Sequence, residues 1–379
     1  MAHVLILGGG FGGIAAARTL RERLGDNVDI TLVDRQPSFL VGFRKSWVLV
    51  GEATLEDGER PIASLSNIDI RVVAGTINSL DPQARSATVD GERLAADALV
   101  VALGAELNPD KIPGFREFAH SVYDRAGVQR ARDALQAFGG GRVVVGIFGG
   151  PIKCPAAPYE MALLVQEQLS ARGLKFEMDV FTPKPGSLPV AGPAACDSLE
   201  GRLSGHGIRF GANRQAVSVT ADNVIFGDGG RLPYDLLLGI APHRAPDVVR
   251  NSGLTQRSDW VPVNPRTLET EFEGVYAIGD VANVKMANGK PMPKAGVFAE
   301  AMGVVAAERI AARLAGNEPT ATFSGEGGCY LEVGNGQAML VTGNFLAEPR
   351  PDVQLTDPSE DQFRQKQEFE ASRLREWFG

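Results

Sequence analysis

A cysteine occupies a loop in which a nucleotide-binding protein would carry glycines. Residues 149–155 read Gly-Gly-Pro-Ile-Lys-Cys-Pro, between an apolar strand predicted over 142–148 and a helix predicted over 159–171. Cys154 comes just before that helix and next to Lys153, and both the helix dipole and the ammonium favour a thiolate. Because the thiolate is the reactive form of cysteine, this loop predicts a redox-active sulfur.

The same loop lacks the groups that bind a nicotinamide dinucleotide. It lacks the third glycine of the fingerprint, and Pro151 and Pro155 have no backbone N–H to donate to a pyrophosphate. The strand that follows, over 176–181, leads into Thr-Pro-Lys-Pro, with no acid for ribose hydroxyls and no arginine for a 2′-phosphate. We interpret Lys184 in that turn as a solvated side chain. The segment therefore predicts a nucleotide-binding fold kept as a scaffold.

A complete glycine fingerprint lies at the start of the chain. Gly8, Gly10 and Gly13 have the Gly-x-Gly-x-x-Gly spacing, between an apolar strand and a helix predicted over 14–24. These glycines permit a tight turn and a close approach of the backbone to a pyrophosphate, which the helix N-terminus then binds. A second strand ends in Asp34, 21 residues after Gly13, where an acid accepts hydrogen bonds from a ribose.

Two downstream segments resemble the FAD flavoproteins that contain two dinucleotide-binding domains. Residues 270–281 end a short strand in Gly-Asp, and residues 97–105 read Asp-Ala-Leu-Val-Val-Ala-Leu-Gly-Ala. The resemblance implies FAD, with Asp280 on its ribitol chain and a helix over 294–314 beginning next to the flavin. There Lys294 would stabilise the negative charge of reduced flavin, unless it is simply solvated. The residues that we expect to hold FAD are Gly8, Gly10, Phe11, Gly12, Gly13, Asp34, Arg35, Ile77, Ala102, Gly104, Gly279, Asp280, Lys294 and Ala295.

The segment around Cys154 is similar to the redox-cysteine motif of sulfide-oxidising flavoproteins. Residues 153–160, Lys-Cys-Pro-Ala-Ala-Pro-Tyr-Glu, resemble that motif in the flavin subunit of flavocytochrome c sulfide dehydrogenase and in sulfide:quinone oxidoreductase. These families carry a second redox cysteine late in the chain, and Gly327-Gly328-Cys329-Tyr330 matches it. The resemblance covers nearly the whole chain and implies a redox disulfide between Cys154 and Cys329.

Such a pair supports a defined chemistry with sulfide. Hydrosulfide attacks the disulfide, leaves a persulfide on one sulfur and frees the other as a thiolate that passes two electrons to the flavin. Glu160 matches a carboxylate that handles protons near the disulfide, or it is a first-turn acid that complements the helix dipole. Without the family context, two inert buried thiols would be the simpler interpretation, and we interpret Cys196 as structural.

The sequence says less about how the flavin is attached and about which molecule accepts its electrons. Residues 39–45 contain no cysteine where flavocytochrome c carries its covalent flavin link, so noncovalent FAD is expected. Residues 359–379 predict one charged helix, in which Leu374, Trp377 and Phe378 share a face. Docking of this face on the protein itself is favoured over contact with a membrane surface. A quinone and a cytochrome both stay open as acceptors, as does the oligomeric state.

Composition excludes several classes of protein. The 379 residues carry a net charge of −8 without a block of lysine or arginine, which argues against a nucleic-acid partner. No stretch is apolar enough to predict a transmembrane helix, and the first residues do not form a signal peptide. We therefore expect a cytoplasmic chain, free or peripheral on the inner face of the membrane. The scattered cysteines and histidines predict no metal site.

These patterns predict an α/β fold of two Rossmann-like domains with a small C-terminal section. We expect an FAD domain from 1–110 and 240–315, a second domain with a degenerate nicotinamide site over 111–239, and a C-terminal section over 316–379. The favoured function is FAD-dependent oxidation of sulfide or a related small sulfur species. The alternatives are an NAD(P)H:acceptor reductase with incidental cysteines and a low-turnover flavin redox sensor or docking protein.

Overall fold

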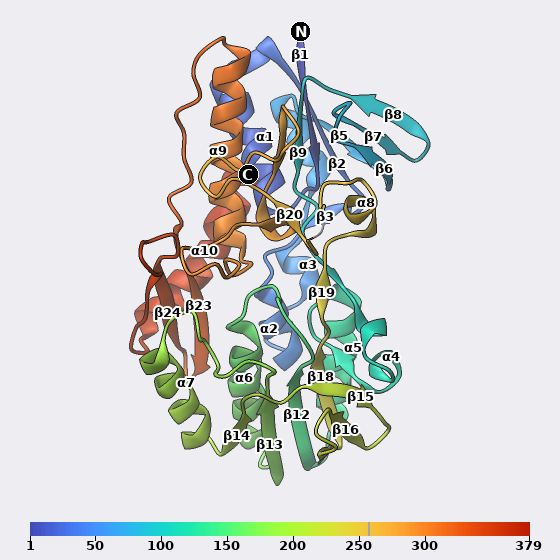
Figure 1. Ribbon diagram of the computed structural model, residues 1–379. Helices are drawn as coiled ribbons and strands as arrows, with labels where there is room; N and C mark the ends of the chain where they lie inside the picture. Colours follow the sequence, from blue (N-terminus) through green and yellow to red (C-terminus); the bar gives the residue numbers. More distant parts are fainter. Residues whose placement is uncertain (257) are drawn as a thin grey trace.

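Two parallel sheets form the core of the computed structural model, which describes residues 1–256 and 258–379 (Figure 1). In the first sheet the strand order is β21-β9-β1-β2-β5, and every neighbouring pair is parallel. Alternate residues of β1 enter different apolar cores, Val4 and Ile6 on one face and Leu5 and Leu7 on the other. Burial of both faces is typical of parallel sheets. The strands are β1 (Ala2–Leu7), β2 (Val28–Asp34), β5 (Arg71–Ala74), β9 (Ala98–Val101) and β21 (Val275–Ala277).

Two helices cover one face of this sheet and approach each other closely. They are α1 (Phe11–Leu24) and α9 (Gly296–Leu314), and they lie side by side in Figure 1. A Cβ on Gly303 would lie only 2.3 Å from the carbonyl oxygen of Gly12. Glycine is required at this crossing because any side chain would push the two helices apart. The predicted helices at 14–24 and 294–314 are thus confirmed to within a few residues.

The second sheet repeats the same parallel arrangement. Its strand order is β11-β18-β12-β13-β14, again with parallel pairing throughout. The predicted two-sheet α/β fold class is therefore confirmed. The strands are β11 (His120–Ser121), β12 (Gly141–Ile147), β13 (Phe176–Phe181), β14 (Ile208–Gly211) and β18 (Leu236–Ile240), and the helices are α4 (Phe115–Phe118), α5 (Arg125–Ala137), α6 (Ala157–Ala171) and α7 (Pro193–Gly205).

Antiparallel sheets and short elements complete the fold. One three-stranded sheet follows β5, a second follows β14, and a third begins the C-terminal section. Their strands are β6 (Ile77–Asp81), β7 (Ser86–Val89) and β8 (Glu92–Ala95); β15 (Ala216–Val219), β16 (Asn223–Phe226) and β17 (Arg231–Pro233); and β23 (Glu326–Gly334), β24 (Gln337–Asn344) and β25 (Asp352–Leu355). The remaining elements are α2 (Arg44–Val50), α3 (Leu55–Gly58) and α8 (Asp247–Arg250), the two-residue strands β3 (Ser38–Phe39), β4 (Arg60–Pro61), β10 (Glu106–Leu107), β19 (His243–Arg244), β20 (Val261–Pro262) and β22 (Ala282–Asn283), and 3-10 turns at Gly25–Asn27, Ile62–Ile68, Pro109–Lys111 and Gly279–Val281.

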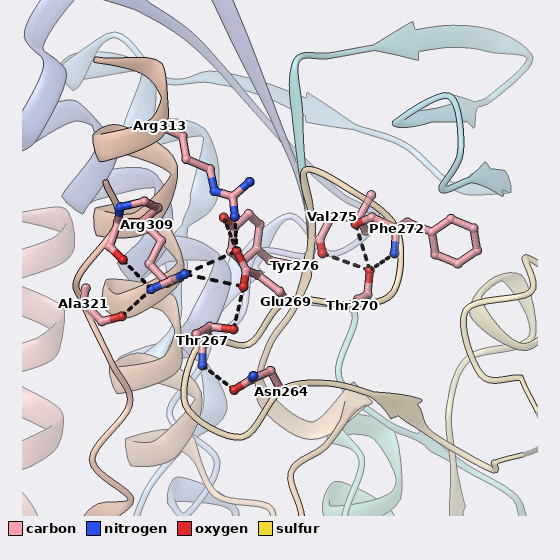
Figure 2. A network of polar contacts seen from close by, with 11 residues as sticks. Asn264, Thr267, Glu269, Thr270, Phe272, Val275, Tyr276, Arg309, Arg313 and Ala321 are labelled. Carbon is pink, nitrogen blue, oxygen red and sulfur yellow. Dashed lines mark hydrogen bonds and ion pairs between the residues drawn. The ribbon is translucent and has the colours of Figure 1, made fainter. Parts of the chain in front are cut away.

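A polar network fastens the segment before β21 to α9 (Figure 2). Glu269 accepts hydrogen bonds from Thr267 Oγ1 at 2.7 Å and from Arg313 at 2.5 Å, and Arg309 lies 3.4 Å from the same carboxylate. Arg309 also donates to the carbonyl of Ala321 at 3.0 Å. Because Gly279-Asp280 follows β21 after one residue, this network ties the segment that leads to that turn to the C-terminal half of α9.

The C-terminal helix α10 (Glu360–Phe378) docks on the first sheet domain. The Trp377 ring lies 5.5 Å from that of Phe11 and 5.3 Å from that of Phe39, both edge to face. Leu374 and Trp377 are buried, so the predicted apolar face packs on the protein itself. Among the residues that the structure describes, no helix has both the length and the apolar character needed to cross a bilayer.

Candidate active site

The glycine loop between β1 and α1 forms a cradle at the N-terminus of α1. Gly8 has a φ of 109°, and a Cβ on it would lie 2.3 Å from the carbonyl oxygen of Ala102. A Cβ on Gly13 would lie 1.8 Å from the carbonyl oxygen of Gly8, whereas a Cβ on Gly10 would meet open space. No side chain caps α1, and its first turn has no acid. This arrangement fits a pyrophosphate held by backbone N–H groups, as the fingerprint predicts.

Asp34 lies at the end of β2 and bonds to the glycine loop. Its Oδ2 accepts the N–H of Gly9 at 2.6 Å, and its Oδ1 accepts the N–H of Gln36 at 2.7 Å. The carboxylate is therefore fixed beside the cradle, where an acid would meet a ribose. The neighbouring Arg35 is exposed and forms an ion pair with Glu106 at 3.3 Å.

Other residues predicted to bind FAD lie at the carboxyl edge of the same sheet. Ala102 and Gly104 directly follow β9, and Gly104 has a φ of 66°. Phe11 and Gly12 begin α1, while Ile77 begins β6 shortly after β5 ends. Ligands of open α/β sheets bind at this edge, so the fold collects these positions where a dinucleotide would lie. Their individual contacts with FAD stay predictions.

Lys294 is buried rather than solvated, and its ammonium bonds to the segment containing Asp280. It is 5% exposed and donates to the carbonyls of Asp280 and Ala282. Its Nζ also lies 3.6 Å from the ring centroid of Trp260, which is a cation–π contact. Burial lowers the pKa of Lys294 to about 8 and raises the pKa of Asp280 above its ordinary value. Ala295 is the N-cap of α9, so Lys294 lies next to that helix N-terminus and holds the Asp280 backbone close to it.

The thiols of Cys154 and Cys329 form a hydrogen bond with each other. Cys154 precedes α6 in the second domain, and Cys329 lies in β23 of the C-terminal section. The hydrogen bond from Cys329 lowers the pKa of the Cys154 thiol, while the same bond and burial raise that of Cys329 well above its usual range. Of the two thiols, Cys154 is therefore the one that loses its proton more readily. The predicted partner of the charge was Lys153, but its Nζ instead donates to the carbonyl of Ala105 at 3.3 Å.

The backbone of Cys154 is tied down on several sides. Its N–H donates to the carbonyl of Lys294 at 2.7 Å, and its own carbonyl accepts from Ala157 N at 3.0 Å and from the Tyr123 hydroxyl at 3.1 Å. Its φ of 43° is in the left-handed region that non-glycine residues seldom adopt. Such conformations persist where the surrounding structure imposes them, often at functional sites. The loop thus joins the cysteine directly to the Asp280–Lys294 region.

Glu160 is an acid in the first turn of α6, and it lies in a buried charge cluster with the C-terminal helix. Its Oε2 is 3.0 Å from Lys366 Nζ and accepts the N–H of Glu332 at 2.8 Å. Lys366 is 0% exposed and also contacts Glu332 Oε2 at 2.8 Å, to which Trp47 donates at 2.7 Å. Burial opposes the charge of Lys366, but Glu160 and Glu332 together raise its pKa above the ordinary value. Glu160 Oε1 has no partner among the described residues.

The degenerate glycine loop is occupied by side chains from neighbouring segments. A Cβ on Gly149 would lie 3.0 Å from the ring of Pro242, and one on Gly150 would lie 3.8 Å from Lys184 Cε. Lys184, which we expected to be solvated, is partly buried, and burial lowers its pKa. Cys196 lies in α7, close to Gly186. The Pro242 ring and the Lys184 side chain thus lie next to the two glycines of the loop.

Sequence patterns did not single out His243, which lies beside the cysteine loop. It is 6% exposed, its Nδ1 lies 2.9 Å from the carbonyl of Ala241, and its ring meets that of Tyr123 at 5.6 Å. The buried Nε2 has no partner among the described residues. Burial, reinforced by Lys153 and Lys294, lowers the pKa of His243 to about 3. The imidazole is therefore neutral in the folded protein at neutral pH.

We expect His243 to make the fold sensitive to acid. In the unfolded chain its imidazole titrates near pH 6.5, so below that pH the unfolded state binds a proton that the folded state excludes. The free energy of unfolding then falls by about 1.4 kcal/mol per pH unit, until the pKa of the folded state is reached. Between pH 6.5 and 4.5 the wild type should lose about 2 to 3 kcal/mol more than His243→Asn, measured by urea denaturation. Equal losses in the two proteins would contradict this.

Fold and site together define a two-domain dinucleotide-dependent oxidoreductase, with a nucleotide cradle in one domain and a thiol pair between the other domain and the C-terminal section. Comparison with known proteins agrees. The model of the pyridine nucleotide-disulphide oxidoreductase family matches residues 2–303. The chain belongs to this family, and it is an FAD-dependent oxidoreductase.

Similarities to individual proteins agree with this family assignment. The chain is similar to the mitochondrial sulfide:quinone oxidoreductase of Mus musculus, with 26% identity over 92% of this chain and 79% of that protein. It is also similar to the sulfide-quinone reductase of Aquifex aeolicus (strain VF5), with 28% identity over 81% of this chain and 76% of that protein. The crystal structure of the Aquifex aeolicus sulfide:quinone oxidoreductase superposes with a TM-score of 0.90 at 25% identity, over 100% of this chain and 92% of that one. These similarities confirm the resemblance that the cysteine motif indicated.

Proposed function

We propose that the protein oxidises sulfide, or a related small sulfur species, through Cys154 and Cys329 and passes the electrons through noncovalently bound FAD to a quinone. The observation that carries this proposal is the contact between the two thiols, which lie 175 residues apart in the sequence. Relatives that are sulfide:quinone oxidoreductases support both sulfide as the substrate and a quinone as the acceptor. A cytochrome, which the sequence also left open, has no such support.

The difference between the two thiol pKa values supports one direction of attack on the oxidised pair. In thiol–disulfide exchange the sulfur with the lower thiol pKa leaves faster, and that sulfur is Cys154. Hydrosulfide therefore bonds to Cys329 Sγ, the bond between the two cysteines breaks, and Cys154 leaves as a thiolate with the electron pair. Cys329 then carries the persulfide. The incoming sulfur is oxidised, and the cysteine pair is reduced by two electrons.

The residues around the pair would support the remaining steps. FAD, when bound, supplies the acceptor for the electron pair of Cys154. The cradle at Gly8 and Gly13 would hold its pyrophosphate, and the buried Lys294 ammonium would favour extra negative charge at the start of α9. Glu160, through its unpaired Oε1, would accept protons released near Cys329.

Anaerobic titration of the holoenzyme with sulfide tests this proposal. We expect stoichiometric bleaching of the flavin spectrum by sulfide and no bleaching by NADH, because Pro151 and Pro155 have no backbone N–H to donate to a pyrophosphate at the second glycine loop. The alternative is an NAD(P)H:acceptor reductase, since the chain is also 24% identical to an alternative NAD(P)H-ubiquinone oxidoreductase of Arabidopsis thaliana. Bleaching by NADH but not by sulfide would establish that alternative. A flavin reduced by sulfide that is never reoxidised by a quinone would favour a redox sensor.

A further inference from the structure

Cys154 adopts a backbone conformation that its local sequence disfavours. Its φ of 43° is left-handed, whereas a residue that precedes a proline, as Cys154 precedes Pro155, prefers an extended backbone. Rotation about the N–Cα bond carries Cβ with it, so relaxation to the extended form would turn the thiol to another direction. A conformation of this kind persists only where the surrounding structure imposes it. The direction of the Cys154 thiol therefore depends on contacts made to its backbone.

Hydrogen bonds hold the backbone of Cys154 at both of its ends. The N–H donates to the carbonyl of Lys294 at 2.7 Å, and the adjacent Lys153 forms a parallel bridge with Lys294. The carbonyl accepts the N–H of Ala157 at 3.0 Å and the hydroxyl of Tyr123 at 3.1 Å. Because both peptide groups are bonded, Cys154 cannot relax without the loss of a hydrogen bond. Among the residues that the structure describes, Tyr123 is the one side chain that bonds to this backbone.

Tyr123 is itself held in place within the second domain. It lies between β11 and α5, and the next residue, Asp124, caps α5 by accepting the N–H of Gly127 at 2.6 Å. The Tyr123 ring is buried and meets that of His243 edge to face, with the ring centroids 5.6 Å apart. Burial also raises the pKa of Tyr123 well above its ordinary value, so the hydroxyl keeps its proton and donates at neutral pH. Tyr123 thus ties the cysteine loop to a fixed point beside the second sheet.

We propose that Tyr123 is a positioning residue whose hydroxyl keeps Cys154 in the left-handed conformation, in which its thiol meets that of Cys329. This inference rests on the proposed function, because it concerns the sulfur that leaves the disulfide and passes electrons to the flavin. Tyr123 acts through the Cys154 backbone and exchanges neither a proton nor an electron. In the oxidised pair the S–S bond also holds the two sulfurs together, whereas in the reduced pair the backbone contacts must do so. Loss of the hydroxyl should therefore favour the reduced pair, in which Cys154 can relax.

The substitution Tyr123→Phe isolates the hydroxyl, because it keeps the ring on His243 and leaves the Cys154 carbonyl bonded to Ala157. The redox equilibrium of the pair is measured in the anaerobic holoenzyme with dithiothreitol, which gives the pair two electrons and two protons and closes to its own cyclic disulfide. Alkylation of the free thiols and mass spectrometry of the peptides with Cys154 and Cys329 give the oxidised fraction. We expect the pair to be about 3- to 10-fold easier to reduce in the variant, as the net contribution of one hydrogen bond allows.

Stopped-flow reduction of the flavin by sulfide gives a second readout. At saturating sulfide the rate in Tyr123→Phe should fall about 3- to 10-fold, because the thiolate that must reach the flavin is held less well. The sulfide concentration at half of that rate should stay within about twofold of the wild type, because the attacked sulfur of Cys329 keeps its place. Tyr234→Phe is the matched control. Its hydroxyl also donates to a backbone carbonyl, that of Thr220, between strands of the antiparallel sheet β15–β17, so both readouts should match the wild type.

An unchanged redox equilibrium in Tyr123→Phe, with flavin content equal to the wild type, would overturn the role of Tyr123 alone. Equal shifts in Tyr123→Phe and Tyr234→Phe would also overturn it, because the effect would then not depend on the contact with Cys154. A wild-type flavin that sulfide does not reduce would instead overturn the proposed function. The dithiothreitol equilibrium would still report on Tyr123 in that case, since it requires no sulfide.

Discussion

Replacing either Cys154 or Cys329 by serine should lower the rate of flavin reduction by sulfide at least about 1000-fold, which corresponds to about 4 kcal/mol of transition-state free energy. In the proposed mechanism each sulfur has a separate role, one as the site of attack and the other as the leaving group. A hydroxyl can form neither the disulfide nor a persulfide. The double variant should be no slower than the single variants, because residues that act as one unit are not additive.

Stopped-flow reduction under anaerobic conditions measures these rates. Cys196→Ser is the matched control, since Cys196 lies in α7 outside the thiol pair, and its rate should stay within about twofold of the wild type. Flavin content and thermal stability of each variant show whether the fold is intact. Equal rates in the wild type and Cys329→Ser would exclude the disulfide route, even if sulfide is the true substrate.

Lys366→Met should lower the free energy of unfolding by about 3 to 5 kcal/mol, because it removes one partner of a buried charge cluster. The side chain is fully buried and contacts two carboxylates, Glu160 at 3.0 Å and Glu332 at 2.8 Å. Without the ammonium these two acids face each other in the core. The loss should also loosen α10, whose other buried ion pair joins Glu370 to Arg44 at 2.6 Å.

Chemical denaturation of the holoenzyme provides the measurement, and the same helix supplies the control. Arg375 pairs with Glu368, but their side chains are 66% and 61% exposed, so Arg375→Met should change the free energy of unfolding by less than about 1 kcal/mol. Adding Glu332→Gln to Lys366→Met should recover part of the loss, because one uncompensated carboxylate is removed. Similar losses in the Lys366 and Arg375 variants would show that the buried cluster does not stabilise the helix.

Patterns within short stretches of sequence were sufficient to predict the fold class and the nucleotide cradle. The fingerprint of Gly8, Gly10 and Gly13 requires a tight turn and a helix N-terminus. Both depend on residues that are near in the sequence. The apolar strands of both sheets are equally local patterns. The motif around Cys154 also indicated the family, since a thiol before a helix is visible without any tertiary contact.

The burial and the pKa values of the site residues depend on neighbours that only the tertiary structure brings together. Cys154 and Cys329 come from different parts of the chain, and their mutual hydrogen bond, rather than Lys153, lowers the pKa of Cys154. Lys366 is an ordinary lysine in the sequence; packing from other segments buries it completely, and two nearby carboxylates raise its pKa. Burial and charge are sums over neighbours in space, and a linear sequence specifies those neighbours only through the completed fold.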